Sequence, residues 1–289
     1  AALEPAELWE SPEPHATAPS SAPNRAIFFT IEITSASNER GSDGTKLPSG
    51  NHPAAEAIVP NRALYLYEVV DIVGQGQYAY MEHLWQDPVL RMPEMFGLQG
   101  SFYVCAAGGG RWPQVINVWD VGSRGWEGWA RNVDRMNLKR RKAFYEGWWD
   151  EASKWRSGGF DRLCGGVPGS PTTPEIRERG IRGTLFLNEI LSVRPGAPLE
   201  FLAAVVEERV PLMESYGHRA TGLYEVTSNQ HEVVMIWATD IASQVRLRQN
   251  RDRTRGLCEE GSVDERIANW DRRQASFVTG GDSHLMTPL

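Results

Sequence analysis

The sequence lacks the motifs by which many catalytic and cofactor-binding sites are recognised. It has only three cysteines in 289 residues, Cys105, Cys164 and Cys258, at wide spacing and without a Cys-x-x-Cys pair. An odd number at such spacing argues against a disulfide framework and is typical of inert thiols in a reducing compartment. No metal-ligand, nucleotide-binding or nucleophile motif stands out. We therefore expect no metal site and no bound cofactor.

Positive charge is also in short supply. The chain carries 30 Lys and Arg against 37 Asp and Glu, a net charge of -7. A general nucleic-acid-binding role needs an excess of basic side chains facing phosphates, so this balance argues against it. The densest basic run, residues 246–255, is predicted to be an exposed helix face of mixed charge.

Long apolar runs are absent as well. No stretch approaches the length of a membrane span, and no basic segment followed by an apolar one opens the sequence. These absences predict a cytoplasmic protein without a membrane partner.

The first 60 residues differ in composition from the rest. Residues 1–25 are rich in Pro, Ala, Ser and Glu, a composition that cannot bury a core. Residues 26–34, AIFFTIEIT, form a β-prone island that could add one strand to a sheet edge. Residues 1–60 are therefore predicted to be an extended arm, either disordered or wrapped on its own or a partner's sheet. The second alternative would make the protein a homo-oligomer.

The remainder of the chain contains an internal repeat. Residues 63–73, ALYLYEVVDIV, and residues 184–193, TLFLNEILSV, alternate as central strands do. Trp119 and Trp237 occupy matching places in a later strand of each copy. Such self-similarity indicates a duplicated unit. We predict one module over 61–156, a connection over 157–180 and a second module over 181–289.

Each module has the expected order strand, helix, strand, strand, helix and short strand, which is that of the ferredoxin-like unit. Helices are predicted within 75–96, 126–155, 198–216 and 240–277. Closing strands are predicted near 160–164 and at the C-terminal end. Helices would cover one face of each sheet, and a second sheet must cover the other. The predicted fold class is α+β, with two tandem ferredoxin-like modules packed sheet to sheet as an α/β barrel.

Three stretches carry a family resemblance: LNEILSVRPG (187–196), QVINVWDV (114–121) and EVVMIWATD (232–240). They resemble the NIPSNAP-like branch of the dimeric α/β-barrel proteins over roughly residues 63–289, which implies this fold. Glu189 stands where family members carry an Arg, so an anion-binding role of that position is not expected here. Several barrels of this type hold haem through a His on the helix after the third strand. Residues 126–155 and 240–277 contain no His, which makes haem the less favoured alternative.

Alternation along the central strands predicts which side chains line the barrel. The aliphatic faces are expected under the helices, and the aromatic and amide faces toward the interior. The chain has 11 Trp, which weakly favours a roomy aromatic interior. The alternative is that the aromatic side chains fill the interior without leaving a cavity. The predicted lining residues are Tyr65, Tyr67, Asn117, Trp119, Phe186, Asn188, Met235 and Trp237.

Two acids interrupt the aliphatic strand faces at matching positions, Glu68 and Glu189. A desolvated carboxylate can act as an acid or base, whereas pairing with an Arg would give it a structural role. By alternation Glu68 faces away from Tyr67, which makes Tyr67 the stronger candidate. His83 precedes Asp87 by four residues on a predicted helix and is a candidate base, with a solvent-facing His as the alternative.

These residues favour an enzyme that binds a small hydrophobic or aromatic molecule in the barrel interior and acts on it without a cofactor. The chemistry would be of isomerase, cyclase, lyase or oxygenase type. The alternatives are a non-catalytic binding or scaffold protein and a haem-dependent enzyme. The predicted catalytic residues are Tyr67, Glu68, Glu189, His83 and Asn117. The predicted substrate-binding residues are Tyr65, Trp119, Phe186, Asn188, Met235 and Trp237.

Overall fold

The structure of the protein, a computed structural model, describes residues 62–86, 97–121, 125–134 and 143–289. All of them belong to one unit of the chain, Glu56–Leu289. The predicted arm over 1–60 lies outside the described residues, as do Asp87 and the rest of the helix expected up to residue 96. Within the described ranges, no helix is both long and apolar enough to cross a membrane.

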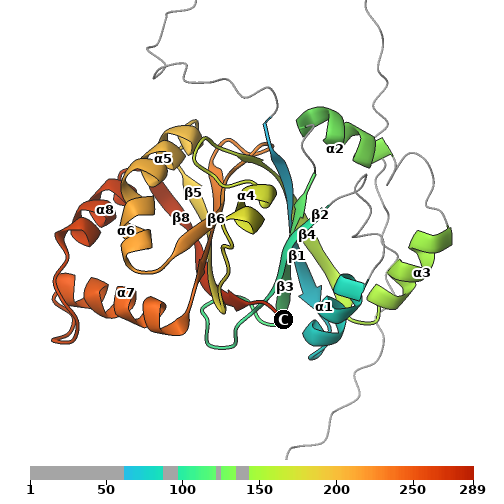
Figure 1. Ribbon diagram of the computed structural model, residues 1–289, viewed down its shortest axis with the longest axis horizontal. Coiled ribbons are helices and arrows are strands. Elements are labelled where there is room, and N and C mark those ends of the chain that lie inside the picture. Colours follow the sequence, from blue (N-terminus) through green and yellow to red (C-terminus); the bar gives the residue numbers. More distant parts are fainter. Residues whose placement is uncertain (1–61, 87–96, 122–124, 135–142) are drawn as a thin grey trace, which may run out of the picture. The chain divides into compact units, whose positions relative to one another are not determined.

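The alternating stretches of the sequence form eight strands in these ranges, and every adjacent pair is antiparallel. The strands close into a barrel in which the two halves of the chain meet twice, through the second and eighth strands and through the fourth and sixth (Figure 1). The predicted α+β class is confirmed. The strands are β1 (Leu64–Ile72), β2 (Gly97–Val104), β3 (Gln114–Asp120), β4 (Arg156–Gly166), β5 (Leu185–Val193), β6 (Arg219–Val226), β7 (Glu232–Thr239) and β8 (Val278–Thr287), in the barrel order β1-β3-β2-β8-β5-β7-β6-β4.

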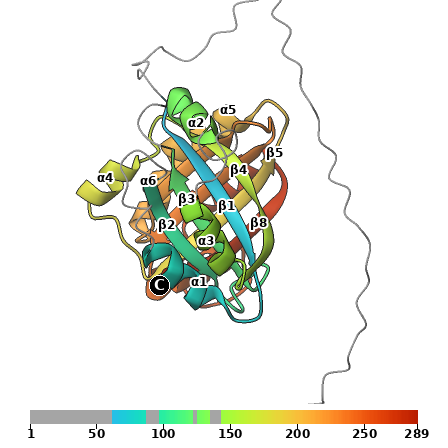
Figure 2. The same ribbon diagram turned by 90° about the vertical axis from the view of Figure 1, so that its right-hand side faces the viewer.

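Helices flank the barrel, those of each half beside the strands of that half (Figure 1). Beside the first half lie α1 (Gln77–Gln86), α2 (Gly125–Val133) and α3 (Ala143–Ala152). Beside the second half lie α5 (Pro198–Ala204), the π-helical turn η3 (Val205–Arg209), α6 (Val210–Ser215), α7 (Ile241–Thr254) and α8 (Glu265–Ala275). Figure 2 shows β1 running between β3 and β4, its two partners in the sheet.

The stretch predicted to connect the two modules, 157–180, contains regular structure. Strand β4 pairs with β1 from Leu64 to Ile72, and α4 (Thr173–Glu178) follows it. The closing strand expected near 160–164 is therefore present and longer than predicted. Its sequence, RSGGFDRLCGG, is glycine-rich, and glycine is depleted in strands, which explains why the sequence signal was weak.

Cross-strand register decides which side chains face the barrel interior. Residues directly opposite in an antiparallel pair point to the same side of the sheet. Tyr67 lies opposite Val118, while Glu68 lies opposite Asn117. In the second half Glu189 likewise lies opposite Met235.

The predicted lining residues therefore divide between the two faces. Tyr65, Tyr67 and Phe186 belong to the interior cluster, as predicted, and Asn188 joins Tyr67 there. The prediction was wrong for Asn117, Trp119, Met235 and Trp237, which lie on the helix side with the two glutamates. Alternation within one strand does not fix its register against the next, and a shift of one residue moves every side chain to the other face.

The interior is filled by aromatic and aliphatic side chains. Tyr65 stacks on Tyr224 with ring centroids 4.7 Å apart, and the rings of Phe102 and Phe186 lie 4.4 Å apart. The structure thus supports the alternative in which aromatic side chains fill the barrel. The buried cluster also contains Val69, Ile116, Val118, Val234, Ile236 and Met286.

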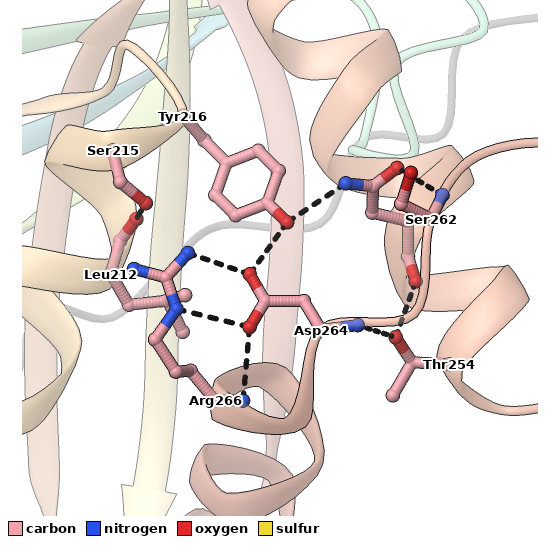
Figure 3. A network of polar contacts seen from close by, with 8 residues as sticks. Leu212, Ser215, Tyr216, Thr254, Ser262, Asp264 and Arg266 are labelled. Atoms are coloured by element: carbon pink, nitrogen blue, oxygen red, sulfur yellow. Dashed lines mark hydrogen bonds and ion pairs between the residues drawn. The ribbon is translucent and has the colours of Figure 1, made fainter.

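A polar network holds the start of α8 against α6 and α7 (Figure 3). Asp264 caps α8 by accepting from the backbone N–H of Arg266 at 3.0 Å, and it pairs with the Arg266 guanidinium at 2.7 Å. The Tyr216 hydroxyl donates to Asp264 at 2.8 Å and accepts from Asn250 at 2.9 Å. The bonds from Arg266, and then that from Tyr216, lower the pKa of Asp264 from 3.8 to about 2.

We expect Asp264→Asn to lower the free energy of unfolding at pH 7 by about 1 kcal/mol, the usual scale of a cap combined with a partly exposed ion pair. Because the folded pKa lies below the usual value, this stabilisation is present above about pH 4 and is lost as the pH falls toward 2. Urea unfolding of both proteins at several pH values measures it. A difference between wild type and D264N that stays constant down to pH 2 would contradict the assignment.

Candidate functional site

The predicted site residues fall into separate places. Glu68, Asn117 and Trp119 meet on the helix side of the first half. On the helix side of the second half, Glu189 bonds to Trp237 and lies opposite Met235. The barrel interior holds Tyr65, Tyr67, Phe186 and Asn188, and His83 lies apart on α1. The five predicted catalytic residues therefore do not form one site.

The interior contains a short polar chain. The Asn188 side-chain amide donates to the Tyr67 hydroxyl at 2.7 Å and lies 3.2 Å from His284 Nε2. Among the described residues, Asn188 Oδ1 has no hydrogen-bond partner. Burial raises the pKa of Tyr67 and lowers the pKa of His284, so both are neutral near pH 7. Tyr67 is 0% exposed, which makes the favoured catalytic candidate a packed core residue.

His83 makes its contacts with α3 and the turn after it. Its ring stacks on Trp148 at 5.3 Å between centroids, and Nε2 lies 3.4 Å from the Trp148 carbonyl oxygen. Trp155 packs on the same imidazole at 5.4 Å. The predicted partner Asp87 lies outside the described residues. These contacts give His83 a packing role between α1 and α3.

Glu68 lies at the centre of the first-half acid cluster, which we define as Glu68, Tyr80, Asn117, Trp119 and Arg156. One Glu68 oxygen accepts from the Trp119 indole and from the Asn117 amide, both at 3.0 Å. The other lies 3.3 Å from the Arg156 guanidinium. Asn117 also donates to the Tyr80 hydroxyl at 3.2 Å. This carboxylate is thus held by two hydrogen bonds and one ion pair.

The second-half acid cluster consists of Glu189, Arg209, Met235 and Trp237. The Trp237 indole donates to one Glu189 oxygen at 2.9 Å, and Arg209 donates to the other at 2.7 Å. Both charged side chains are only 8% exposed. The same Glu–Trp pair thus occurs in both halves, and a different element supplies each Arg. The alternative that each Glu pairs with an Arg is the one the structure supports.

The π-helical turn η3 brings Arg209 to this cluster. The Val210 N–H donates to the Val205 carbonyl, five residues back. Pro211 has no N–H to give, so it favours a local change in the helical hydrogen bonding. π-Helical turns often occur at functional sites. Arg209 is not among the site residues predicted from the sequence, where the available signal was a proline two residues after an arginine inside a helical stretch.

A pocket of about 250 Å³ reaches the second-half acid cluster from the helix side. It lies between β5 and helices α6, α7 and α8, and we call it the helix-side pocket. Glu189 and Arg209 contribute to its polar lining. A neighbouring hollow of about 330 Å³ under α7 shares Leu187, Arg248 and Ser283 with it. The apolar lining of the helix-side pocket comprises Leu187, Leu191, Leu212, Met213, Leu247, Ile267 and Trp270.

Charged side chains of the 246–255 run reach this pocket. Arg248 and Arg251 both line it. Arg251 pairs with Asp271 at 2.8 Å, and Arg255 pairs with the same carboxylate at 2.6 Å. Arg246, Arg248 and Arg255 are exposed, as predicted, whereas Arg251 is partly buried beside Asp271. Because α8 packs against α7, Asp271 of α8 lies close enough to pair with Arg251 and Arg255.

The side chains of the pocket suit an organic ligand. Guanidinium groups bind carboxylates through paired hydrogen bonds and are not metal ligands. No three His, Cys, Asp or Glu side chains come together as a metal site would need, as far as the described residues extend.

No protein-family model matches the chain, and no curated protein matches it. Solved structures do share its fold. A "putative monooxygenase" from Fusobacterium nucleatum subsp. nucleatum aligns with a TM-score of 0.50 at 10% identity, covering 80% of this chain and 94% of that one. A "putative monooxygenase" from Lactobacillus acidophilus aligns with a TM-score of 0.49 at 10% identity, covering 78% and 93%. At this identity the likeness to the first shows the fold alone.

Proposed function

We propose that the protein binds a small hydrophobic or aromatic molecule in the helix-side pocket and acts on it by acid–base chemistry without a cofactor. The reaction would be of isomerase, cyclase, lyase or oxygenase type. The observation that carries the proposal is a buried carboxylate, Glu189, in the lining of a pocket whose lining residues are half apolar and half polar. Small-molecule sites usually combine apolar lining with placed polar groups that orient the ligand.

Glu189 is the candidate base. Each of its oxygens accepts one bond, from Arg209 or from Trp237, and a carboxylate oxygen can accept a second. The two donors fix the orientation of the carboxylate, so that a substrate proton can approach the remaining lone pairs. Its counterpart Glu68 also accepts two hydrogen bonds, but both are made to one oxygen, while the other oxygen is ion-paired with Arg156 at 3.3 Å.

We further infer that the two halves are tandem ferredoxin-like modules of the NIPSNAP-like kind. The strand order supports this, since β4-β1-β3-β2 in the first half matches β8-β5-β7-β6 in the second. The repeated Glu–Trp pair supports it independently. In such a duplication one copy can keep a structural cluster while the other develops a pocket.

The binding part of the proposal is tested by NMR of the tryptophan indole N–H groups during titration with 2-naphthamide and 2-naphthoate. Trp270 lines the pocket and Trp237 donates to Glu189, so we expect both signals to shift on binding. The Trp119 signal reports the matching Glu–Trp pair of the first half and should stay in place. Trp→Phe variants assign the three signals.

The chemical part is tested in the same samples by following the bound compounds for conversion. Any conversion should occur with wild type and with the exposed-residue control Glu214→Gln, and should be lost in Glu189→Gln. If no compound shifts Trp237 or Trp270, or if Trp119 shifts equally, the pocket is not the binding site. The non-catalytic scaffold alternative would then be the better account.

A further inference from the structure

The helix-side pocket contains more arginines than acids. Glu189 pairs with Arg209 at 2.7 Å, and Asp271 pairs with Arg251 at 2.8 Å. The remaining charged residue of the lining is Arg248. Within the part of the chain that the structure describes, no carboxylate lies within ion-pair distance of it. The two acids are thus already paired, and one cation is left over.

Arg248 lies where the two hollows meet. It lines the helix-side pocket and also the hollow under α7, whose other polar lining residues are Gln244, Gln249, Asp252, Ser283 and His284. The residue remains accessible to solvent, so a ligand can reach it. Partial burial, and then the positive charge of Arg251, lower the pKa of the Arg248 guanidinium. An anion bound beside Arg248 would offset the repulsion between the Arg248 and Arg251 guanidinium groups.

We propose that Arg248 binds the carboxylate of the ligand, so that the substrate class of the pocket is small aromatic or apolar carboxylates. The ring or chain would lie against Leu212, Ile267 and Trp270, and the carboxylate would face Arg248 at the junction of the hollows. A planar guanidinium matches a carboxylate with two parallel hydrogen bonds, whereas an uncharged amide can accept only through its single carbonyl oxygen. This inference rests on the proposed function and adds the charge of the ligand.

The experiment compares 2-naphthoate with 2-naphthamide, which differ in charge and hardly in shape, by isothermal titration calorimetry. We expect the wild-type protein to bind 2-naphthoate about tenfold more tightly, the usual effect of one charge-assisted hydrogen-bonding pair. Arg248→Gln should lose this preference while keeping its affinity for 2-naphthamide. Arg246→Gln is the matched control, because Arg246 lies on the same helix and outside both linings. It should keep the full preference.

The possible outcomes separate this inference from the proposed function. If 2-naphthamide binds as tightly as 2-naphthoate and shifts the Trp237 and Trp270 signals, the pocket is a binding site and the inference about charge is wrong. A preference that survives in R248Q would assign the carboxylate to another residue and also overturn the inference. If neither compound binds, both proposals fail. Retained folding of R248Q is checked by its thermal unfolding midpoint.

Discussion

Arg209→Met will lower the free energy of unfolding by about 3 to 5 kcal/mol, because it leaves the Glu189 carboxylate buried without its cation. Both side chains of this pair are only 8% exposed, so water in the helix-side pocket can replace the guanidinium only in part. Methionine keeps the length and apolar volume of the side chain, which limits the effect to the lost charge and hydrogen bonds. Denaturant unfolding followed by tryptophan fluorescence gives the measurement.

Two further variants separate a charge effect from a packing effect. The double variant Glu189→Met with Arg209→Met removes both charges and should recover most of the loss, since buried ion pairs can be replaced by apolar groups at little cost. Arg156→Met removes the matching arginine of the first half. That pair is longer, at 3.3 Å, and its side chains are 18% and 16% exposed, so we expect a smaller loss. Equal losses in R209M and in the double variant would contradict the explanation.

Gly159→Ala and Gly281→Ala will each lower the free energy of unfolding by at least about 2 kcal/mol. Both glycines have left-handed backbone angles, with φ of +146° and +131°. A Cβ atom on Gly159 would meet the carbonyl oxygen of Val69, and one on Gly281 that of Ile190. Backbone atoms of a paired strand cannot move aside as the end of a flexible side chain can.

The chain provides a matched control for each variant in the neighbouring glycine. Gly158 and Gly280 have no heavy atom within 4 Å of an added Cβ and no left-handed φ. We expect Gly158→Ala and Gly280→Ala to change stability by less than about 0.5 kcal/mol. Both pairs lie beside a register shift, in β4 against β1 and in β8 against β5. If all four variants have equal effects, the close approach of the strands is not the cause.

Sequence reasoning went further with the fold than with the site. The repeated strands β1 and β5, the helical stretches and the C-terminal strand β8 follow from local patterns, because alternation and helical periodicity can be recognised within one segment. Strand β4 was the weakest signal because of its four glycines. It is set by pairing with β1, which the sequence of β4 alone does not encode.

The site required information from several segments at once. Glu189 was found because an acid within an aliphatic strand face is unusual, and the same argument found Glu68. Arg209 was missed because its position depends on a π-helical turn. Arg248 is exposed, as predicted, but a helix alone does not show that its side chain also lines a pocket. The pocket that joins these residues exists only where β5, α6, α7 and α8 meet.

By itself the sequence determined a mixed α and β chain with two matching strands, each bearing a glutamate. The tertiary structure decided the register, and with it that Trp119 and Trp237 lie beside the glutamates while Tyr65 and Tyr67 fill the barrel. The physical reason is the period of the strand. Alternation tells which side chains share a face, but pairing with the neighbouring strand decides which face meets the core and which meets the helices.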